Sequence, residues 1–337
     1  MHKSDFQPTV SIIIPVYNGA NYMREAIDSA LAQTYDKTET IIINDGSNDN
    51  GETERIAQSY GGKVRYFSKP NGGVATALNL GISKMTGEYF SWLSHDDKYF
   101  PNKISAQIEL LSQLTNKTTI IFSGWAIIDA SGKEIHRVIP LRKYTEKQLT
   151  TPLFALLHTQ INGCTLLIHK SHFARVGTFD EKLKTTQDFD LWFRMMRGTP
   201  IACHPDALSL TRVHGQQTGS TSAKSHSTEG DDLWINMMET VSEKEKAELD
   251  GSPYNFYRSL YRLLYPFVHR QAVAHAKRKA LDELRKSGGA FRHIKAIGLY
   301  TSGYTALLRS FFASIKDAGI SNTAKRVKMV LKRLFSK

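Results

Sequence analysis

The chain has 337 residues, and its 44 lysines and arginines against 32 aspartates and glutamates give a formal net charge of +12. An apolar share of 41% with 23% charged residues excludes a disordered chain and a multi-span membrane protein. No stretch approaches the roughly 18 to 20 consecutive apolar residues of a membrane-spanning helix, and the first residues lack the apolar core of a signal peptide, so we expect a cytoplasmic protein. The two cysteines, Cys164 and Cys203, are too few for a disulfide framework or a structural zinc site.

The positive charge is concentrated towards the C-terminal end. Residues 251–337 contain 18 lysines and arginines against 3 acidic residues, a net charge of +15 that leaves −3 for residues 1–250. An acid-rich stretch precedes this region and ends at Gly251-Ser252-Pro253, which is typical of a helix end and a turn. We therefore expect a main domain over residues 1–225, an acidic helical linker over 226–253 and a basic helical region over 254–337.

The first half of the chain alternates strand-like and helix-like segments. The β-branched run at residues 10–16 is typical of a strand buried on both faces, and Pro15 limits how far its ladder continues. A helical pattern opens at Asn21, and the next apolar run covers residues 40–44. The alternation continues with a helix after residue 49, a strand at 64–67, a helix at 73–85, a strand at 89–93 and a helix at 101–114. This order predicts an α/β sheet built from right-handed crossovers.

Polar side chains follow three of the predicted strands: Tyr17, then Asp45, then Asp96 and Asp97. Ligands of such sheets bind at the carboxyl ends of the strands. A tyrosine ring can stack on a base, a carboxylate can accept from the N3–H of a uracil-type base, and neighbouring carboxylates can hold a hard divalent cation. Since neither a dinucleotide fingerprint nor a P-loop is present, we expect Mn²⁺ or Mg²⁺ to bind the phosphates.

In their order along the chain, these motifs resemble the inverting family 2 nucleotide-sugar glycosyltransferases of the GT-A fold, over about residues 8–222. Residues 10–18 are similar to the family's first strand and nucleotide-contacting loop, and residues 44–47 to the loop whose aspartate binds the base. Residues 71–82 resemble the segment near the ribose and diphosphate. Residues 94–97 match the Asp-x-Asp position, although Ser94 replaces the frequent leading aspartate. The resemblance implies a mixed sheet flanked by helices, followed here by the basic helical region.

The resemblance also assigns roles to single residues. It implies that the nucleotide is bound by Pro15, Val16, Tyr17, Asp45, Gly73 and Asp96, and the metal by Asp97 with His214 assisting. Each motif alone has a plainer interpretation, because an Asp-Asp pair is most often a solvated turn and a lone histidine most often a surface residue. Their positions directly after strands favour the nucleotide site.

Residues 187–192 resemble the family's Glu/Gln-Asp-x-Asp-Leu-Trp helix start, and Asp188 falls at the position of the catalytic base. Displacement at an anomeric carbon needs a carboxylate near the attacking hydroxyl to take its proton. Helix capping is the alternative for either acid, and we expect it for Asp190. Trp192 is expected on the acceptor side, with core packing as the alternative. Residues 163–168 are expected to form a strand resembling the acceptor-side segment.

The C-terminal region lies outside the resemblance. Aromatic and aliphatic residues at helical spacing over 254–268 indicate an amphipathic helix, and residues 325–335 show the pattern of a helix on a membrane surface. Each basic residue near an anionic leaflet contributes about 1 kcal/mol, so this region would hold the protein at a membrane. The alternative is a helix that packs its apolar face on the main domain. We expect no nucleic-acid partner, because no nucleic-acid-binding motif accompanies the charge.

Together these features predict a metal-dependent inverting glycosyltransferase. It would move a sugar from a nucleoside-diphosphate sugar, expected to be UDP-linked, to a hydroxyl of a glycan or lipid-linked acceptor in cell-surface polysaccharide synthesis. We expect it on the inner face of the plasma membrane. Two alternatives remain open: a sugar nucleotidyltransferase, which normally has a Gly-rich loop after the first strand, and a non-catalytic membrane-associated adaptor that binds nucleotide sugars.

Overall fold

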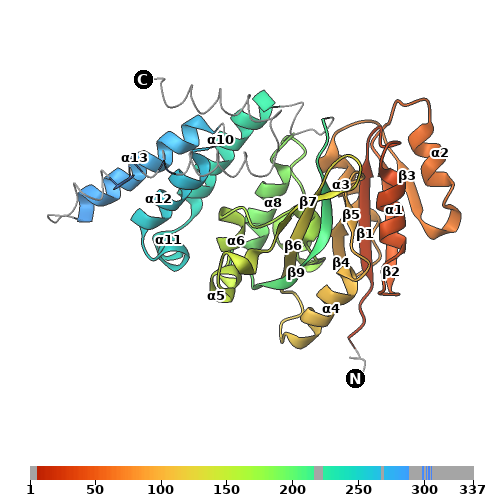
Figure 1. The fold of residues 1–337 in the computed structure, drawn as a ribbon, viewed down its shortest axis with the longest axis horizontal. Helices are drawn as coiled ribbons and strands as arrows, with labels where there is room; N and C mark the ends of the chain where they lie inside the picture. The colour runs from red at the N-terminus through yellow and green to blue at the C-terminus, as the bar shows by residue number, and fades with distance from the viewer. Residues whose placement is uncertain are drawn as a thin grey trace. The chain divides into compact units, whose positions relative to one another are not determined.

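The computed structural model describes residues 6–215, 223–266 and 269–287, together with residues 298, 299, 301, 303 and 305. The chain divides into two compact units, residues 1–222 and 223–337 (Figure 1). The first half of unit 1 contains β1 (Val10–Val16), α1 (Met23–Leu31), β2 (Thr38–Asn44), α2 (Glu52–Gln58), β3 (Arg65–Ser68), α3 (Val74–Lys84), β4 (Tyr89–Trp92), β5 (Lys98–Tyr99) and α4 (Lys103–Gln113). Its second half contains β6 (Ile120–Ile128), β7 (Glu134–Val138), α5 (Glu146–Thr150), α6 (Phe154–Leu157), β8 (Ile168–His169), α7 (Ser171–Val176), α8 (Gln187–Met196) and β9 (Ile201–Arg212), with short 3₁₀ turns at Gly61–Lys63, Pro140–Arg142 and Gly163–Thr165.

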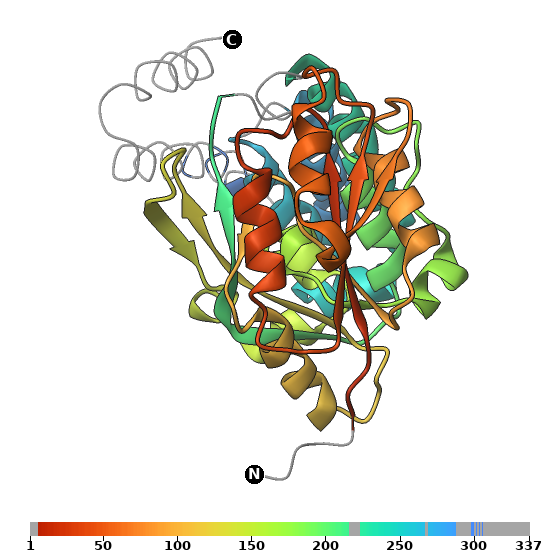
Figure 2. The ribbon, with the colours of Figure 1, turned by 90° about the vertical axis from the view of Figure 1, so that its right-hand side faces the viewer.

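Two sheets organise unit 1. The five-stranded sheet has the order β3-β2-β1-β4-β8, in which β8 alone runs antiparallel to its neighbour. The four-stranded sheet has the order β5-β9-β6-β7. Helices α1 and α3 lie on opposite sides of the central strand β1 (Figure 2). The predicted α/β architecture, a mixed sheet flanked by helices, is confirmed.

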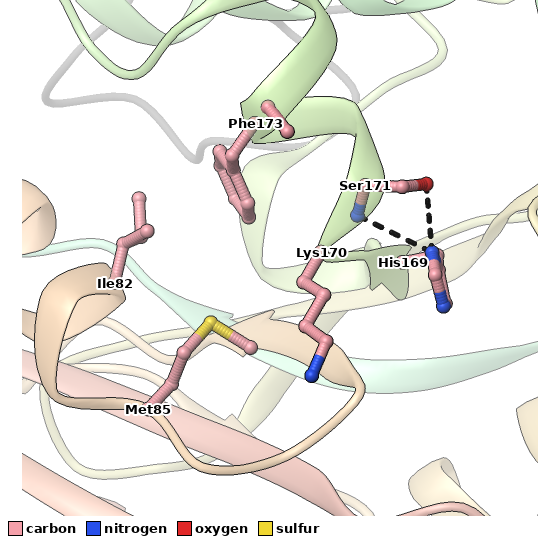
Figure 3. Close-up of a pocket in the computed structure, with 7 residues that line it drawn as sticks. Ile82, Met85, His169, Lys170, Ser171 and Phe173 are labelled. Carbon is pink, nitrogen blue, oxygen red and sulfur yellow. Dashed lines mark hydrogen bonds between the residues drawn. The ribbon is translucent and has the colours of Figure 1, made fainter.

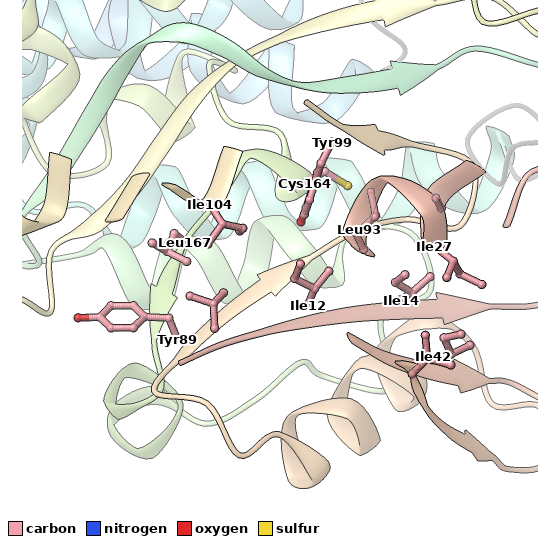
Figure 4. Packing of buried hydrophobic residues seen from close by; sticks show 14 of the residues in the cluster. Ile12, Ile14, Ile27, Ile42, Tyr89, Leu93, Tyr99, Ile104, Cys164 and Leu167 are labelled. Atoms are coloured by element: carbon pink, nitrogen blue, oxygen red, sulfur yellow. The ribbon is translucent and has the colours of Figure 1, made fainter. Parts of the chain in front are cut away.

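The central strand β1 is buried along its whole length, which explains its continuous β-branched sequence. Ile12 and Ile14 join Ile27 of α1 in the hydrophobic core cluster (Figure 4). On the opposite face, Gly81 of α3 lies so close to Ile13 that a Cβ there would come within 2.4 Å of the isoleucine Cγ2. The glycine therefore lets α3 pack directly on the sheet.

Pro15 marks the place where β1 and β4 separate. The two strands pair from Val10 to Ile13, and the last bond joins the Leu93 N–H to the Ile13 carbonyl at 3.0 Å. Successive residues of a strand point their N–H groups to alternate sides, so the missing donor of Pro15 would face β4. Because pairing with β2 continues to Val16, the ladder ends on the β4 side only. The expected limit on the ladder is confirmed there, at the edge where polar loops follow both strands.

The segment at residues 163–168 differs from the expected strand. Gly163–Thr165 forms a 3₁₀ turn, and only Ile168–His169 pairs as a strand. The Asn162 side chain accepts the Cys164 N–H at 2.9 Å, which closes a local turn in place of a ladder bond. Gly163 lies against the Trp92 ring, where a Cβ would be only 2.6 Å from a ring carbon.

Unit 2 is helical over its described residues, with α10 (Ala223–Thr240), α11 (Glu243–Asp250), α12 (Pro253–Leu264) and α13 (Arg270–Ser287). The predicted amphipathic helix is confirmed over α12, and its apolar side is buried within unit 2, at Phe256, Tyr257, Leu260, Tyr261 and Leu264. The segment 325–335 lies outside the described residues. Among the helices that the structure describes, none is long and apolar enough to cross a membrane.

Candidate active site

The loops that follow β1 and β2 are joined to each other. Asn18 has a positive φ of 49°, and its side chain and N–H make three hydrogen bonds to residues 47 and 48. The Asp45 N–H donates to the Val16 carbonyl at 2.8 Å. Tyr17 is 44% exposed at this edge. The predicted nucleotide-binding residues Val16, Tyr17 and Asp45 therefore lie together at the carboxyl ends of two neighbouring parallel strands.

Asp45 is buried and organises the loop at residues 69–73. Its Oδ1 accepts the Gly72 N–H at 3.0 Å and the Lys69 ammonium at 2.5 Å, and its Oδ2 accepts the Gly73 N–H at 2.7 Å. Gly73 has a φ of 94°, a conformation that favours glycine, and α3 begins at the next residue. One further lone-pair direction of Oδ2 is available to a ligand donor. The sequence analysis missed Lys69, because a lysine after an edge strand carries no distinctive pattern.

The residues that follow β4 form an acidic turn, residues 94–97. The Asp96 carboxylate extends towards His214, whose Nε2 lies 3.0 Å from the aspartate Oδ2. Both side chains are largely buried, with exposed fractions of 13% and 9%. The structure thus brings together two predicted site residues that are 118 positions apart.

Asp97, the predicted metal ligand, is only 5% exposed and bonds interior donors. Its Oδ1 accepts the Arg212 N–H at 2.9 Å, and its Oδ2 accepts the Cys164 thiol at 3.3 Å. Burial, with the charge of Asp96 beside it, raises the pKa of the Asp97 carboxyl to about 8. Each oxygen accepts one interior donor, and these two bonds hold Asp97 in the turn. The role of Asp97 as metal ligand stays a prediction, and Asp96 is the carboxylate of the pair that lies beside the histidine.

The donor set at this turn fits a divalent cation bound chiefly by its substrate. In the described part of the chain, no group of three or more histidine, cysteine or acidic side chains is arranged to hold a metal by itself. Asp96 and His214 would supply one carboxylate oxygen and one imidazole nitrogen, which suit Mn²⁺. Ions of this kind commonly take their other ligands from water and substrate phosphates.

Arg212 fixes the acidic turn from behind. The residue is fully buried, and its Nε donates to the Asp96 carbonyl at 3.0 Å while its N–H holds Asp97. Its guanidinium also pairs with Glu25 of α1 at 2.9 Å and lies 4.4 Å from the centre of the Tyr22 ring. Arg212, Val213 and His214 form an Arg-x-His segment, and only the structure shows that Arg212 acts on the turn.

Asp188 lies in the first turn of α8, where the helix dipole favours a negative charge. Its Oδ1 accepts the N–H of Phe189 at 2.9 Å. The neighbouring acid Asp190 is bound by Arg194 through two hydrogen bonds of 3.0 and 2.7 Å. Arg194 in turn holds the carbonyls of residues 176 and 178, so Asp190 helps to position the helix.

A row of aromatic rings joins α8 to β4. Trp92, the last residue of β4, contacts Phe179 edge-on with 6.3 Å between ring centroids, and Phe179 contacts Trp192 of α8 at 5.6 Å. The side-chain amide of Asn79 in α3 donates to the Phe179 carbonyl and accepts the Phe179 N–H, both at 3.0 Å. The row therefore connects the helix that carries Asp188 to the strand that leads into the acidic turn.

Trp192 is a core residue in this arrangement. Its side chain is 1% exposed, and its ring packs against Phe179. A direct contact with an acceptor requires an exposed ring. The acceptor-side role of Trp192 therefore stays a prediction, and the ring would affect the acceptor only indirectly, through packing. The alternative weighed from the sequence, a core aromatic on its helix, describes where the ring lies.

A pocket of about 480 Å³ lies elsewhere in unit 1, lined by Ile82, Met85, His169, Lys170, Ser171, Phe173 and Ala174. In Figure 3, His169 and Ser171 are hydrogen-bonded to each other at one side of the pocket, through the Nδ1 and Oγ atoms at 2.7 Å. None of the predicted site residues lines this pocket. The strand-end residues therefore form a separate site.

Comparison with known proteins relates this geometry to a family. The model of the family described as Glycosyl transferase family 2 matches residues 11–173. An uncharacterized glycosyltransferase of Rickettsia prowazekii is 42% identical over 327 residues, which cover 97% of each chain. Three further uncharacterized glycosyltransferases, from Rickettsia bellii, Rickettsia felis and Rickettsia conorii, are 48%, 51% and 51% identical over 84%, 74% and 74% of this chain. The chain spans only 41% of the length of each of these three relatives.

Two solved structures share the fold. The crystal structure of S. aureus TarS 1–349 in complex with UDP-GlcNAc has a TM-score of 0.62 at 16% identity, over 90% of this chain and 92% of that one. The mannosyltransferase PcManGT from Pyrobaculum calidifontis, in complex with GDP-Man and Mn²⁺, has a TM-score of 0.52 at 19% identity, over 99% of this chain and 89% of that one.

Proposed function

The chain belongs to glycosyl transferase family 2 and has the GT-A fold, and from this premise we propose that it transfers a sugar from a nucleoside-diphosphate donor to an acceptor hydroxyl with inversion. The observation that carries the proposal is the pairing of Asp96 with His214 at the sheet edge that also holds Asp45 and Tyr17. This reaction needs a site for the nucleotide's base, a site for the cation, and a carboxylate to take the acceptor proton, here at a helix start.

The nucleotide would bind at the ends of β1 and β2. The exposed ring of Tyr17 would stack on the base, and the Asp45 Oδ2, which accepts one N–H in the structure, would accept a second donor from the base edge. We propose UDP as the nucleotide, because a single N3–H matches a single available acceptor direction. The complex of TarS with UDP-GlcNAc supports this choice, whereas the complex of PcManGT with GDP-Man keeps guanine as the competing base.

Asp96 and His214 would hold the cation, Mn²⁺ or Mg²⁺, on the diphosphate. When bound, the cation neutralises the charge that develops on the leaving nucleoside diphosphate. The presence of Mn²⁺ in the PcManGT complex supports this assignment. Asp97 and Arg212 would keep the acidic turn in the conformation that presents Asp96.

Asp188 would act as the base. It would accept the proton of the acceptor hydroxyl as that oxygen attacks the anomeric carbon from the face opposite the leaving group, which inverts the configuration. Its place in the first turn of α8, where the helix dipole favours a negative charge, supports this assignment.

The acceptor would be a glycan or a lipid-linked sugar of the cell surface, and the basic region 254–337 would hold the protein on an anionic membrane. The net charge of +15 in residues 251–337 supports this part of the proposal. The apolar side of α12 is already buried in the folded protein. The described part of this region would therefore contribute to membrane binding only through its charge. Binding to vesicles with and without anionic lipid tests the membrane contact: we expect binding only to the anionic vesicles, and it should weaken as salt rises.

The first experiment is a donor screen. Purified protein is incubated with Mn²⁺ and a panel of nucleotide sugars, and released nucleoside diphosphate is detected beside the variants Asp96→Asn and His214→Ala. We expect release from one donor that is lost in both variants and kept in Asp206→Asn, a control at an exposed aspartate on β9. Release of pyrophosphate would indicate a nucleotidyltransferase. Absence of both turnover and donor binding by calorimetry would favour the adaptor.

A further inference from the structure

The start of α1 lies against the proposed metal-binding pair. Tyr22 is the N-cap residue of this helix and follows the loop that carries Tyr17. Its ring centroid is 4.9 Å from that of His214, with 51° between the ring planes. The guanidinium carbon of Arg212 lies 4.4 Å from the centre of the same ring. One aromatic side chain thus contacts both the histidine and the arginine of the Arg-x-His segment.

Glu25, three residues further along α1, also contacts Arg212. Its Oε2 accepts the Arg212 Nη2 at 2.9 Å and the Lys98 ammonium at 3.1 Å. Arg212 donates through Nε to the Asp96 carbonyl, so the carboxylate of Glu25 is connected through one side chain to the backbone of the acidic turn. The first turn of α1 therefore contacts both members of the metal-facing pair, Asp96 through Arg212 and His214 through Tyr22.

A histidine is a good metal ligand only when its ring is held at the correct rotation. Rotation about its side-chain bonds would carry the Nε2 of His214 away from the Asp96 oxygen, which lies 3.0 Å distant. Outer partners that fix such a ring commonly change metal affinity by about 10- to 100-fold. The flat ring of Tyr22 beside the imidazole limits that rotation, and it does so from the helix that begins at the nucleotide loop.

We propose that Tyr22 is a positioning residue for His214, and that the first turn of α1 thereby sets the affinity of the site for the cation. This inference rests on the proposed function, because it takes Asp96 and His214 as the metal-binding pair. The contacts that the structure describes for the Tyr22 side chain run through its ring, so the aromatic plane carries the effect.

The test measures Mn²⁺ affinity in the presence of UDP, by the electron paramagnetic resonance signal of free Mn²⁺. Tyr22→Leu should weaken binding about 10-fold, whereas Tyr22→Phe should stay within about twofold of the wild type. Tyr60→Leu is the matched control, because Tyr60 also packs on α1 but bonds Asp28 instead of the Arg-x-His segment. Its Mn²⁺ affinity should match that of the wild type.

A double-mutant cycle separates positioning from a general structural effect. In a His214→Ala background, Tyr22→Leu should cause no further loss, because the ring that it positions is absent. An equal loss in both backgrounds, or an unchanged affinity in Tyr22→Leu while His214→Ala is weakened, would overturn the inference and leave the proposed metal site intact. A wild-type protein that binds no Mn²⁺ with UDP would overturn the metal site itself. If Tyr22→Leu does not fold, Tyr22→Thr provides a favourable N-cap residue and removes the same ring.

Discussion

The two units of the chain treat their charged residues differently. In unit 1, Asp45, Asp97, Lys103 and Arg212 are at most 5% exposed, and the Arg212 guanidinium binds Glu25 across 187 positions. In unit 2, four ion pairs join residues only three or four positions apart, two within α11 and two within α13, and seven of the eight side chains are at least 19% exposed. The buried side of α12 instead consists of aromatic and aliphatic residues.

This difference indicates where chemistry is located in the molecule. A buried charge is costly unless its partners are fixed, so a fold keeps one where its position matters. A surface pair three or four residues apart contributes little and mainly keeps a helix soluble. Changes to these buried charges of unit 1 should therefore have large and specific effects, whereas changes to the helical ion pairs of unit 2 should have small effects.

The largest effect is expected at the proposed base. Asp188→Asn should lower the rate of transfer at saturating donor by about 10²- to 10⁴-fold, because the acceptor proton loses its carboxylate. Donor binding, measured by calorimetry, should remain close to that of the wild type. In contrast, Asp190→Asn should lower the unfolding temperature by loosening Arg194 and affect the rate less. Near-normal transfer by Asp188→Asn would remove the base assignment.

A matched pair of arginines tests the comparison between the units directly. Arg212→Met should lower the free energy of unfolding by about 1–3 kcal/mol, because it leaves the Asp96 carbonyl and Glu25 without the guanidinium donor, while the backbone N–H that binds Asp97 remains. Arg285→Met in unit 2 removes an ion pair whose arginine side chain is 77% exposed. This variant should change the free energy of unfolding by less than about 0.5 kcal/mol. Urea denaturation measures both. Similar values for the two variants would contradict the comparison.

The buried amine of Lys103 predicts a pH-dependent stability. Burial lowers its pKa to about 7, while the unfolded chain keeps the ordinary value near 10.5. Between these values the unfolded state binds more protons, so the contribution of this group destabilises the fold progressively as pH falls from about 10.5 to 7.

Lys103→Met removes that dependence. Over this range, the difference in unfolding free energy between variant and wild type should shift in favour of the variant as pH falls, by at most about 1.4 kcal/mol per pH unit. The lost bonds to Ser91 and Gln107 add a constant cost, so the slope is the diagnostic quantity. Parallel curves from denaturant titrations at several pH values would rule out the lowered pKa.

The smallest effect on activity is expected at the buried carboxylate of unit 2. Asp231 is 4% exposed and accepts the Ala272 N–H at 2.8 Å, at the start of α13. Asp231→Ala should cost about 1–2 kcal/mol of stability, the usual value of a lost helix-terminal acceptor, and leave Mn²⁺ affinity unchanged. If Asp231→Ala reduced the Mn²⁺ affinity, a buried carboxylate of unit 2 would also affect the metal site, and the distinction between the two units would fail.

Much of the site could be predicted because its residues directly follow strands. The run at residues 10–16 indicated a strand buried on both faces, and the strand order then placed Tyr17, Asp45 and Asp96 at one edge. The structure distinguishes the two carboxylates of the acidic turn, because adjacent aspartates in a turn point in different directions. The sequence shows two carboxylates side by side, and only the packing of Arg212 and Cys164 reveals that Asp97 faces inward.

Local pattern determined which segments are strands and helices, since periodicity and turn residues act within about ten positions. The uneven distribution of charge along the chain and the family motifs are likewise properties of the sequence alone. Tertiary structure decided which side chains meet: Asp96 with His214, Glu25 with Arg212, and Phe179 between Trp92 and Trp192. Those contacts join residues separated by 13 to 187 positions. Their partners are fixed by the packing of whole elements, which no local pattern encodes.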